Sequence, residues 1–108
     1  ISSEFFQYLN NPKGNITSNY KSLFIANSKE IRNKIEDHFK ENLVAMTGYV
    51  YKIPLHQQPR VINSFGFRKR NLEKTDLFCN THFTPPNYPE LTNDEINYVC
   101  KVMNEFSI

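Results

Sequence analysis

Three histidines are the side chains in this sequence best suited to acid–base or binding chemistry. His56 lies in residues 54–59 (PLHQQP), an irregular segment that directly follows a run of strand-forming residues. Such segments often present binding groups at the edge of a rigid scaffold, where a histidine can donate, accept or bear charge. His38 falls within a helical pattern, and His82 precedes two prolines, so a half-buried helix histidine and a turn histidine are the simpler interpretations. His56 is therefore the candidate contact residue, and a purely structural hydrogen bond is its alternative role.

Cysteine chemistry and metal binding are not indicated by the spacing. The two cysteines, Cys79 and Cys100, cannot form a disulfide framework, and we expect both to be reduced thiols. A zinc site needs four nitrogen or sulfur ligands, usually in close pairs. Cys79 and His82 are three residues apart, but Cys100 belongs to a helical stripe that faces the core. We expect no metal site and no catalytic nucleophile, because nothing indicates the lowered thiol pKa and orienting base that a nucleophile needs.

A basic run follows the histidine segment, since Arg68, Lys69 and Arg70 come directly after residues 65–67 (FGF). Aromatic and basic side chains together can stack on bases and contact phosphates. The RNA-recognition signature needs a valine-containing strand next, however, and RKRN stands there instead. A solvated basic loop and a contact with the diphosphate of a nucleotide-type ligand both remain open. The glycines at 14, 48 and 66 are too scattered for a glycine-rich phosphate loop.

Composition limits the scaffold to one domain. The chain has 108 residues, 39% hydrophobic and 22% charged, which is enough for one core and excludes a disordered tail. A net charge of +2 is too small to indicate nucleic acid or an anionic membrane by itself. No apolar run approaches the roughly 20 residues of a membrane span. The first residues lack the pattern of a signal peptide, so we expect a cytoplasmic location.

Hydrophobic periodicity predicts the elements. Ile31, Ile35, Phe39 and Leu43 recur every four residues, which indicates an amphipathic helix capped by Asn27 or Ser28 with its Lys, Arg and Glu residues facing solvent. Near the end, Thr92 and Glu95 form a capping box, Leu91 and Ile96 a hydrophobic staple, and Ile96, Val99, Cys100 and Met103 an apolar stripe. We predict helices over residues 3–9, 28–42, 72–80 and 93–105, strands over 20–26, 44–53 and 81–84, a turn at 12–15 and an irregular segment over 54–71. The fold class expected is α+β, with a small antiparallel or mixed sheet and helices packed on one face.

A family resemblance extends this interpretation. Residues 49–59 (YVYKIPLHQQP) resemble the V-H-Y-x-P-L-H-x-Q-P stretch of the DegT/DnrJ/StrS family, which comprises pyridoxal-phosphate-dependent sugar-nucleotide aminotransferases and related dehydrases. Residues 87–99 (NYPELTNDEINYV) are similar to that family's Y-P-x-L-T-x-E-E-x-x-Y-V ending. The order and spacing agree over about residues 16–106. Tyr51 and Lys52 stand where the family commonly has His-Tyr, and Glu90 replaces a frequent glycine.

The resemblance implies that residues 1–108 are the C-terminal small domain of a fold-type I pyridoxal-phosphate enzyme. The Schiff-base lysine and the residues that hold the cofactor would lie in a large domain, so this domain alone is expected to bind no cofactor and to be inactive. Nucleotide sugar and amino donor would be the partners of a full-length homodimer that forms through the large domain and serves polysaccharide or lipopolysaccharide biosynthesis, without nucleic acid or membrane. We expect substrate contacts from Tyr51, Lys52, His56, Gln58 and Arg60, and phosphate contacts from Arg68, Lys69 and Arg70.

Two alternatives stay open. The 3-dehydrase branch of the family resembles residues 72–76 (LEKTD) together with Asn80, Phe83, Tyr88, Pro89 and Leu91. Residues 55–59 look more like the aminotransferase branch. A non-catalytic, stand-alone binding or scaffold domain of the same fold is the second alternative. The resemblance leaves the sugar, the nucleotide and the amino donor open.

Overall fold

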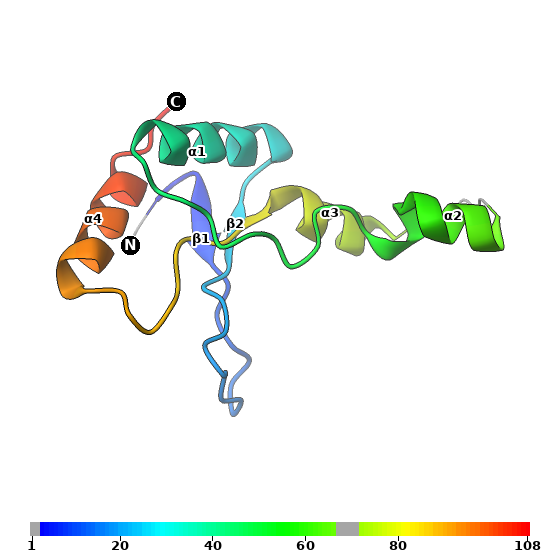
Figure 1. Ribbon diagram of the computed structural model, residues 1–108, viewed down its shortest axis with the longest axis horizontal. Coiled ribbons are helices and arrows are strands. Elements are labelled where there is room, and N and C mark those ends of the chain that lie inside the picture. The colour runs from blue at the N-terminus through cyan, green and yellow to red at the C-terminus, as the bar shows by residue number, and fades with distance from the viewer. Residues whose placement is uncertain (1–2, 67–71) are drawn as a thin grey trace.

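The computed structural model describes residues 3–66 and 72–108 of the chain, and in these ranges it confirms an α+β fold. Figure 1 shows a body built on a small sheet, with α1 and α4 beside it and further helices extending to one side. The elements in chain order are β1 (Phe6–Tyr8), β2 (Phe24–Ala26), α1 (Lys29–Glu41), the 3-10 helix η1 (Leu55–Gln57), α2 (Pro59–Phe65), α3 (Glu73–Thr81), β3 (His82–Phe83) and α4 (Asn93–Asn104).

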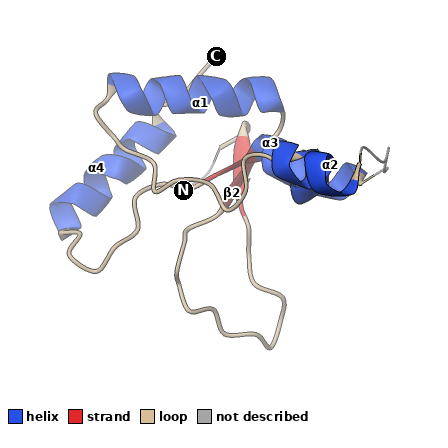
Figure 2. Ribbon diagram, turned by 45° about the vertical axis from the view of Figure 1, so that its right-hand side comes forward, coloured by secondary structure: helices blue, strands red, loops and turns tan. Residues whose placement is uncertain are grey.

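The sheet is antiparallel, with the strand order β1-β2-β3. Phe6 lies opposite Ala26, and Phe24 lies opposite Phe83, so these four residues share one face. That face packs against α1 and α4, as Figure 2 shows, and the aromatic rings of the three strands contact one another at centroid distances of 5.4–5.8 Å. His82 lies on the opposite face of the sheet, paired with Ile25.

Helices α1 and α4 supply the rest of the core. Ile35 and Phe39 of α1 and Val102 and Met103 of α4 are almost completely buried against the sheet. The Ser28 hydroxyl accepts the Ile31 N–H at the start of α1, and the Thr92–Glu95 capping box begins α4, as predicted. Burial of these apolar faces, rather than helix propensity, is the main stabilising contribution in helices of this length.

Two segments project from the body (Figure 1). One is the connection between β1 and β2, which turns at residues 12–15 as predicted, with Gly14 at a φ of +87°. The other consists of η1, α2 and α3, and we call it the arm. The radius of gyration of 15.8 Å exceeds the value of about 13 Å expected for a compact domain of this size. No helix in the described ranges is both long and apolar enough to cross a membrane.

Three predicted elements are wrong or shorter than predicted. The helix over 3–9 is instead β1, because Phe6 completes the buried aromatic face of the sheet; the Ser3 hydroxyl does accept the Phe5 N–H at 3.0 Å. Only residues 24–26 of the strand over 20–26 are paired. The segment predicted to be irregular contains two helices within its described residues 54–66, namely η1 and α2. Pro59 is the first residue of α2, where the backbone N–H that proline lacks would have no partner within the helix.

The predicted strand over 44–53 is also wrong. The segment runs beside β3, and the Thr47 N–H donates to the Thr84 carbonyl at 3.1 Å, but the next inter-segment bond goes to a side chain. The Val50 N–H donates to His82 Nε2 at 3.1 Å, and Gly48 between them has a φ of +88°. The His82 imidazole thus takes the place of the backbone carbonyl that would accept the Val50 N–H in a β-sheet. Regular strand pairing between this segment and β3 therefore ends here.

The helical faces also differ from the pattern at four positions. Leu43 lies beyond the end of α1 with a φ of +58° and is 93% exposed, whereas Arg32, predicted to face solvent, is buried. On α4, Ile96 is 43% exposed, and Val102 takes the core position instead. Cys100, predicted to lie in the core, is only half-buried.

Met103→Ala should lower the free energy of unfolding by about 2–5 kcal/mol, because it removes a fully buried side chain. Thr92→Ala should cost about 0.5–2 kcal/mol through loss of the cap. Urea denaturation measures both, with the exposed Ile96→Ala on the same helix as the control. Equal losses for Met103→Ala and Ile96→Ala would contradict the burial of this helix face.

Candidate functional site

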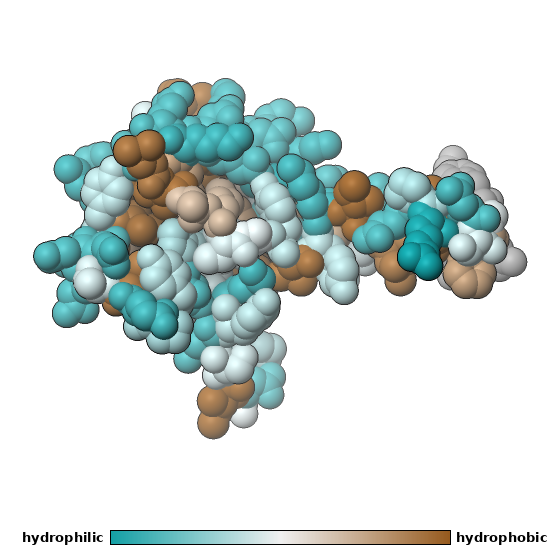
Figure 3. All heavy atoms as spheres, viewed as in Figure 1, coloured by the Kyte–Doolittle hydropathy of each residue, from teal (hydrophilic) through white to brown (hydrophobic). Residues whose placement is uncertain are grey.

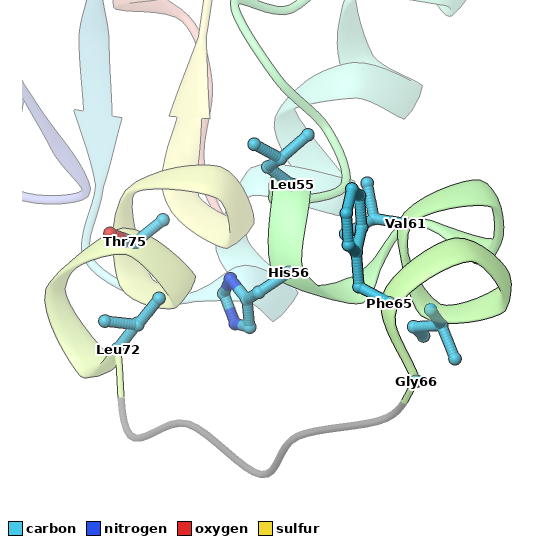
Figure 4. Close-up of a pocket in the computed structure, with 8 residues that line it drawn as sticks. Leu55, His56, Val61, Phe65, Gly66, Leu72 and Thr75 are labelled. Carbon is cyan, nitrogen blue, oxygen red and sulfur yellow. The ribbon is translucent and has the colours of Figure 1, made fainter.

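The arm contains a cavity of about 480 Å³ beside His56. Figure 4 shows that η1, α2 and the start of α3 contribute its walls, with His56 between α3 and the side chain of Phe65. The walls are mainly apolar, and Thr75 and His56 supply the polar side chains. The described lining residues are Leu55, His56, Val61, Ile62, Phe65, Gly66, Leu72 and Thr75. Mainly apolar walls with a few polar groups are typical of small-molecule sites.

His56 is paired with a carboxylate that the sequence analysis did not place beside it. Its Nε2 lies 3.1 Å from Asp76 Oδ1, and the Gln57 side-chain amide donates to the same oxygen at 2.8 Å. Asp76 lies in the first turn of α3, so these bonds connect η1 to α3 across the intervening α2. The predicted contact residue is therefore held in place by a charged partner 20 positions later in the chain.

The other predicted substrate residues do not converge on His56. Gln58 is turned back, and its side chain donates to the Ile53 carbonyl at 3.2 Å. Arg60 is exposed on α2 and does not line the cavity. The phosphate-contact candidates Arg68, Lys69 and Arg70 lie outside the described residues.

Tyr51 and Lys52 belong to a different surface. Tyr51 lines a second cavity of about 430 Å³, together with Tyr20, Lys21 and Tyr49. The Lys52 ammonium lies 5.1 Å from the centroid of the Tyr49 ring, which is within the range of a cation–π contact. The single ligand-facing edge predicted over residues 51–70 is thus divided between two cavities in the described ranges.

Arg32 fixes the base of the arm and was missed by the sequence analysis. Its side chain is 3% exposed, and Nη1 donates to the Cys79 carbonyl at 2.7 Å, at the end of α3. Its guanidinium lies 5.2 Å from the Tyr49 ring centroid, and its Nε lies 3.5 Å from Glu36 Oε1. The helical period gave a signal: Arg32 precedes the core residues Ile35 and Phe39 by three and seven positions, which places it on the buried face.

His82, predicted to be a turn histidine, is a fully buried neutral imidazole instead. Its Nδ1 donates to the Phe78 carbonyl at 2.7 Å, and its Nε2 accepts the Val50 N–H, so these partners define one tautomer. Its ring stacks on Phe78 at 4.4 Å. Burial lowers the pKa of His82 below its usual value, and the positive charge of Arg32 lowers it further, while the bond to Phe78 acts in the opposite direction.

The remaining candidates have structural roles. His38 is half-buried as predicted, and its Nε2 donates to the Val102 carbonyl at 2.7 Å. Both cysteines are free thiols, and burial raises the pKa of Cys79, so it is a poor nucleophile. The described ranges hold no cluster of three or more potential metal ligands from His, Cys, Asp and Glu.

Comparison with known proteins assigns the chain to a family. The model of the DegT/DnrJ/EryC1/StrS aminotransferase family matches residues 4–104, nearly the whole chain, including the arm and α4. The chain belongs to this family. Members of the DegT/DnrJ/EryC1/StrS family are generally pyridoxal-phosphate-dependent, and the chain is a domain of this aminotransferase- and dehydratase-related type.

A curated relative shows how small a part of such a protein the chain represents. The chain is 31% identical over 75 residues to a pleiotropic regulatory protein of Geobacillus stearothermophilus. The matched region covers 69% of this chain and 20% of that relative, so the chain spans about a fifth of the length of the curated relative it matches.

The buried His82 should make the stability depend on pH. Because its pKa is lower in the folded state, the unfolded chain binds more protons as the pH falls below about 6.5, and the free energy of unfolding decreases. His82→Gln should lose about 1–3 kcal/mol at pH 7.5 through unsatisfied groups and should show a shallower decrease between pH 7 and pH 5. Denaturant unfolding across this range measures both slopes. Parallel slopes in the two proteins would show that His82 is not protonated on unfolding.

Proposed function

We propose that this chain is the C-terminal small domain of a sugar-nucleotide aminotransferase. The full enzyme would transfer an amino group from an amino donor to a keto-deoxy-sugar nucleotide. The match of residues 4–104 to the aminotransferase family is the observation that supports this function most strongly. The PLHQQP segment supports the aminotransferase branch, and the arm presents its histidine beside a cavity.

The cofactor would be held by the rest of the polypeptide. When bound, pyridoxal phosphate supplies the electron sink for amino transfer. The main cavities of the described residues do not fit it, because none of them combines a lysine with an arginine or a glycine-rich turn for the phosphate. Lys21 lines the second cavity, but its ammonium donates to the Thr47 carbonyl at 3.0 Å. No step of the proposal therefore passes through the cofactor in this domain.

The domain would position the sugar and exclude water. The apolar walls formed by Leu55, Val61 and Phe65 can cover the C–H face of a sugar ring, and His56 can hydrogen-bond a hydroxyl group. Tyr51, which lines the second cavity, and Lys52, whose ammonium lies against the Tyr49 ring of that cavity, are candidates for the nucleotide moiety of the same substrate. In this proposal the full enzyme is a cytoplasmic homodimer that assembles through the missing large domain.

A 3-dehydrase of the same family is the second candidate. Residues 72–76 favour it, since they resemble that branch and include Asp76, the partner of His56. The two reactions differ at the Schiff-base position in the large domain, where lysine favours amino transfer and histidine favours dehydration. The upstream coding sequence would decide between them. An open reading frame that starts near Ile1 would support a non-catalytic domain instead, and the name of the regulatory relative agrees with that third possibility.

His56→Ala in the complete enzyme should raise KM for the nucleotide sugar by about tenfold, equivalent to one hydrogen bond of about 1.4 kcal/mol. The cofactor absorbance should not change, because the large domain holds the cofactor. Steady-state kinetics and the absorbance spectrum measure the two effects. Asn63→Ala, an exposed change on α2, is the control and should match the wild type.

A purely structural role of His56 predicts a different outcome for the same variant. If His56 only fixes η1, His56→Ala should lower the melting temperature and leave the kinetics of the folded fraction unchanged. That outcome would remove His56 from the substrate site. A wild-type enzyme without amino-transfer or dehydration activity on nucleotide sugars would contradict the proposed function itself.

A further inference from the structure

We propose that Asp76 is a positioning residue for substrate binding, acting through His56. The inference rests on the proposed function, because it assigns a second residue to the same site. Asp76 itself does not line the cavity. It would determine which nitrogen of His56 is available to a ligand.

The contact geometry determines where the proton of His56 lies. Asp76 Oδ1 lies 3.1 Å from His56 Nε2, and the side chains of these residues are 34% and 16% exposed. An ionised carboxylate oxygen can only accept, so the imidazole nitrogen facing it must bear a proton. Gln57 donates to the same oxygen at 2.8 Å, which limits the positions that the carboxylate can take. The Gln57 side-chain nitrogen also lies 3.4 Å from His56 Nε2, which is longer than the 3.1 Å contact of that nitrogen with Asp76.

The fold fixes the backbone position of Asp76. Asp76 lies in the first turn of α3, where the helix dipole stabilises negative charge. Its own N–H bonds the Leu72 carbonyl at 2.9 Å, so the helical turn fixes the backbone from which the side chain extends. The pair is therefore formed between a fixed helix start and the rigid 3-10 turn that follows the buried Pro54.

The other nitrogen of His56 then becomes the ligand-binding atom. Within the described ranges, Nδ1 has no hydrogen-bond partner, and with Nε2 protonated it is an acceptor. The neighbouring side chains of Leu55, Phe65 and Leu72 are 66%, 76% and 40% exposed, so they offer an apolar surface for a ligand to cover. A ligand bound there would exclude water from that surface and so strengthen a hydrogen bond made to His56. The site would therefore take a ligand that combines an apolar face with a hydrogen-bond donor, such as a hydroxyl on a deoxy-sugar ring.

A double-mutant cycle in the complete enzyme tests the role of Asp76. Asp76→Asn keeps the size of the side chain and one acceptor oxygen, so the connection between η1 and α3 can persist. Its amide can also donate to His56 Nε2, however, so it no longer fixes which nitrogen of His56 bears the proton. We expect kcat/KM for the nucleotide sugar to fall by up to about tenfold, mainly through KM, because the loss cannot exceed the one predicted for His56→Ala. In a His56→Ala background, Asp76→Asn should have no further effect, because both changes remove the same interaction.

A matched control removes the same charge nearby. Glu73→Gln lies in the same first turn of α3, does not line this cavity, and should leave kcat/KM at the wild-type value. If Asp76→Asn fails to fold, Asp76→Glu in the same cycle provides the test. It keeps the charge but displaces the oxygen, and it should show the same lack of effect in the His56→Ala background.

The outcomes separate the two proposals. An active wild type in which Asp76→Asn equals the wild type, or in which the two changes act independently, overturns the role of Asp76 and leaves the proposed function standing. A wild type that performs neither amino transfer nor dehydration overturns both.

Discussion

The placement of the arm depends on the two hydrogen bonds made by the neutral imidazole of His82. It is completely buried, and its two nitrogens bond different segments: Nδ1 donates to Phe78 of α3, and Nε2 accepts from Val50 in the segment that leads to η1. The buried Arg32 reinforces the same junction from α1, through the Cys79 carbonyl and the Tyr49 ring. Both ends of the arm are therefore anchored to the sheet by polar side chains. These buried hydrogen bonds stabilise the fold while both partners are present. Removing one partner lowers the free energy of unfolding, because the other buried group is left with its full desolvation penalty.

The sequence predicted the elements whose signals are local and missed those that depend on distant partners. Ser28 with the period of Ile35 and Phe39 located α1, and the Thr92–Glu95 capping box located α4. The segment around Val50 has strand-forming residues, yet its pairing depends on a histidine 32 positions later, which no local pattern indicates. Residues 3–9 were predicted to form a helix because a serine at their start can cap one. Residues 6–8 pair with β2 instead, so the partner strand overrides the local signal.

The candidate site likewise contains one residue that local sequence indicates and one that only the fold brings into place. His56 was predicted as a contact residue from its neighbours, because two prolines in a segment after a strand-like run indicate a rigid loop. Asp76 was not, since its role depends on the fold of α2 and α3, which brings positions 56 and 76 together. Arg32 is the exception, because the period of α1 already placed it on the buried face. We predicted that Arg32 faces solvent because charged side chains are generally exposed. Arg32 is buried instead because a carbonyl, a carboxylate and an aromatic ring all lie close to its guanidinium.

The two projecting segments explain why so much apolar surface remains exposed in a domain of this size. Phe65, Leu55 and Leu77 on the arm and Ile16 in the β1–β2 connection are all largely exposed, and Figure 3 shows apolar surface on both projections as well as between α1 and α4. Isolated apolar side chains on a surface need no explanation, but these lie on segments that extend away from the core. A chain that folded for its own stability alone would gain by folding such segments back onto the body. The anchors at His82 and Arg32 oppose this for the arm, since they bond Phe78, Cys79 and Val50 at its two ends. Polar interactions thereby hold an apolar-walled cavity and its histidine away from the core.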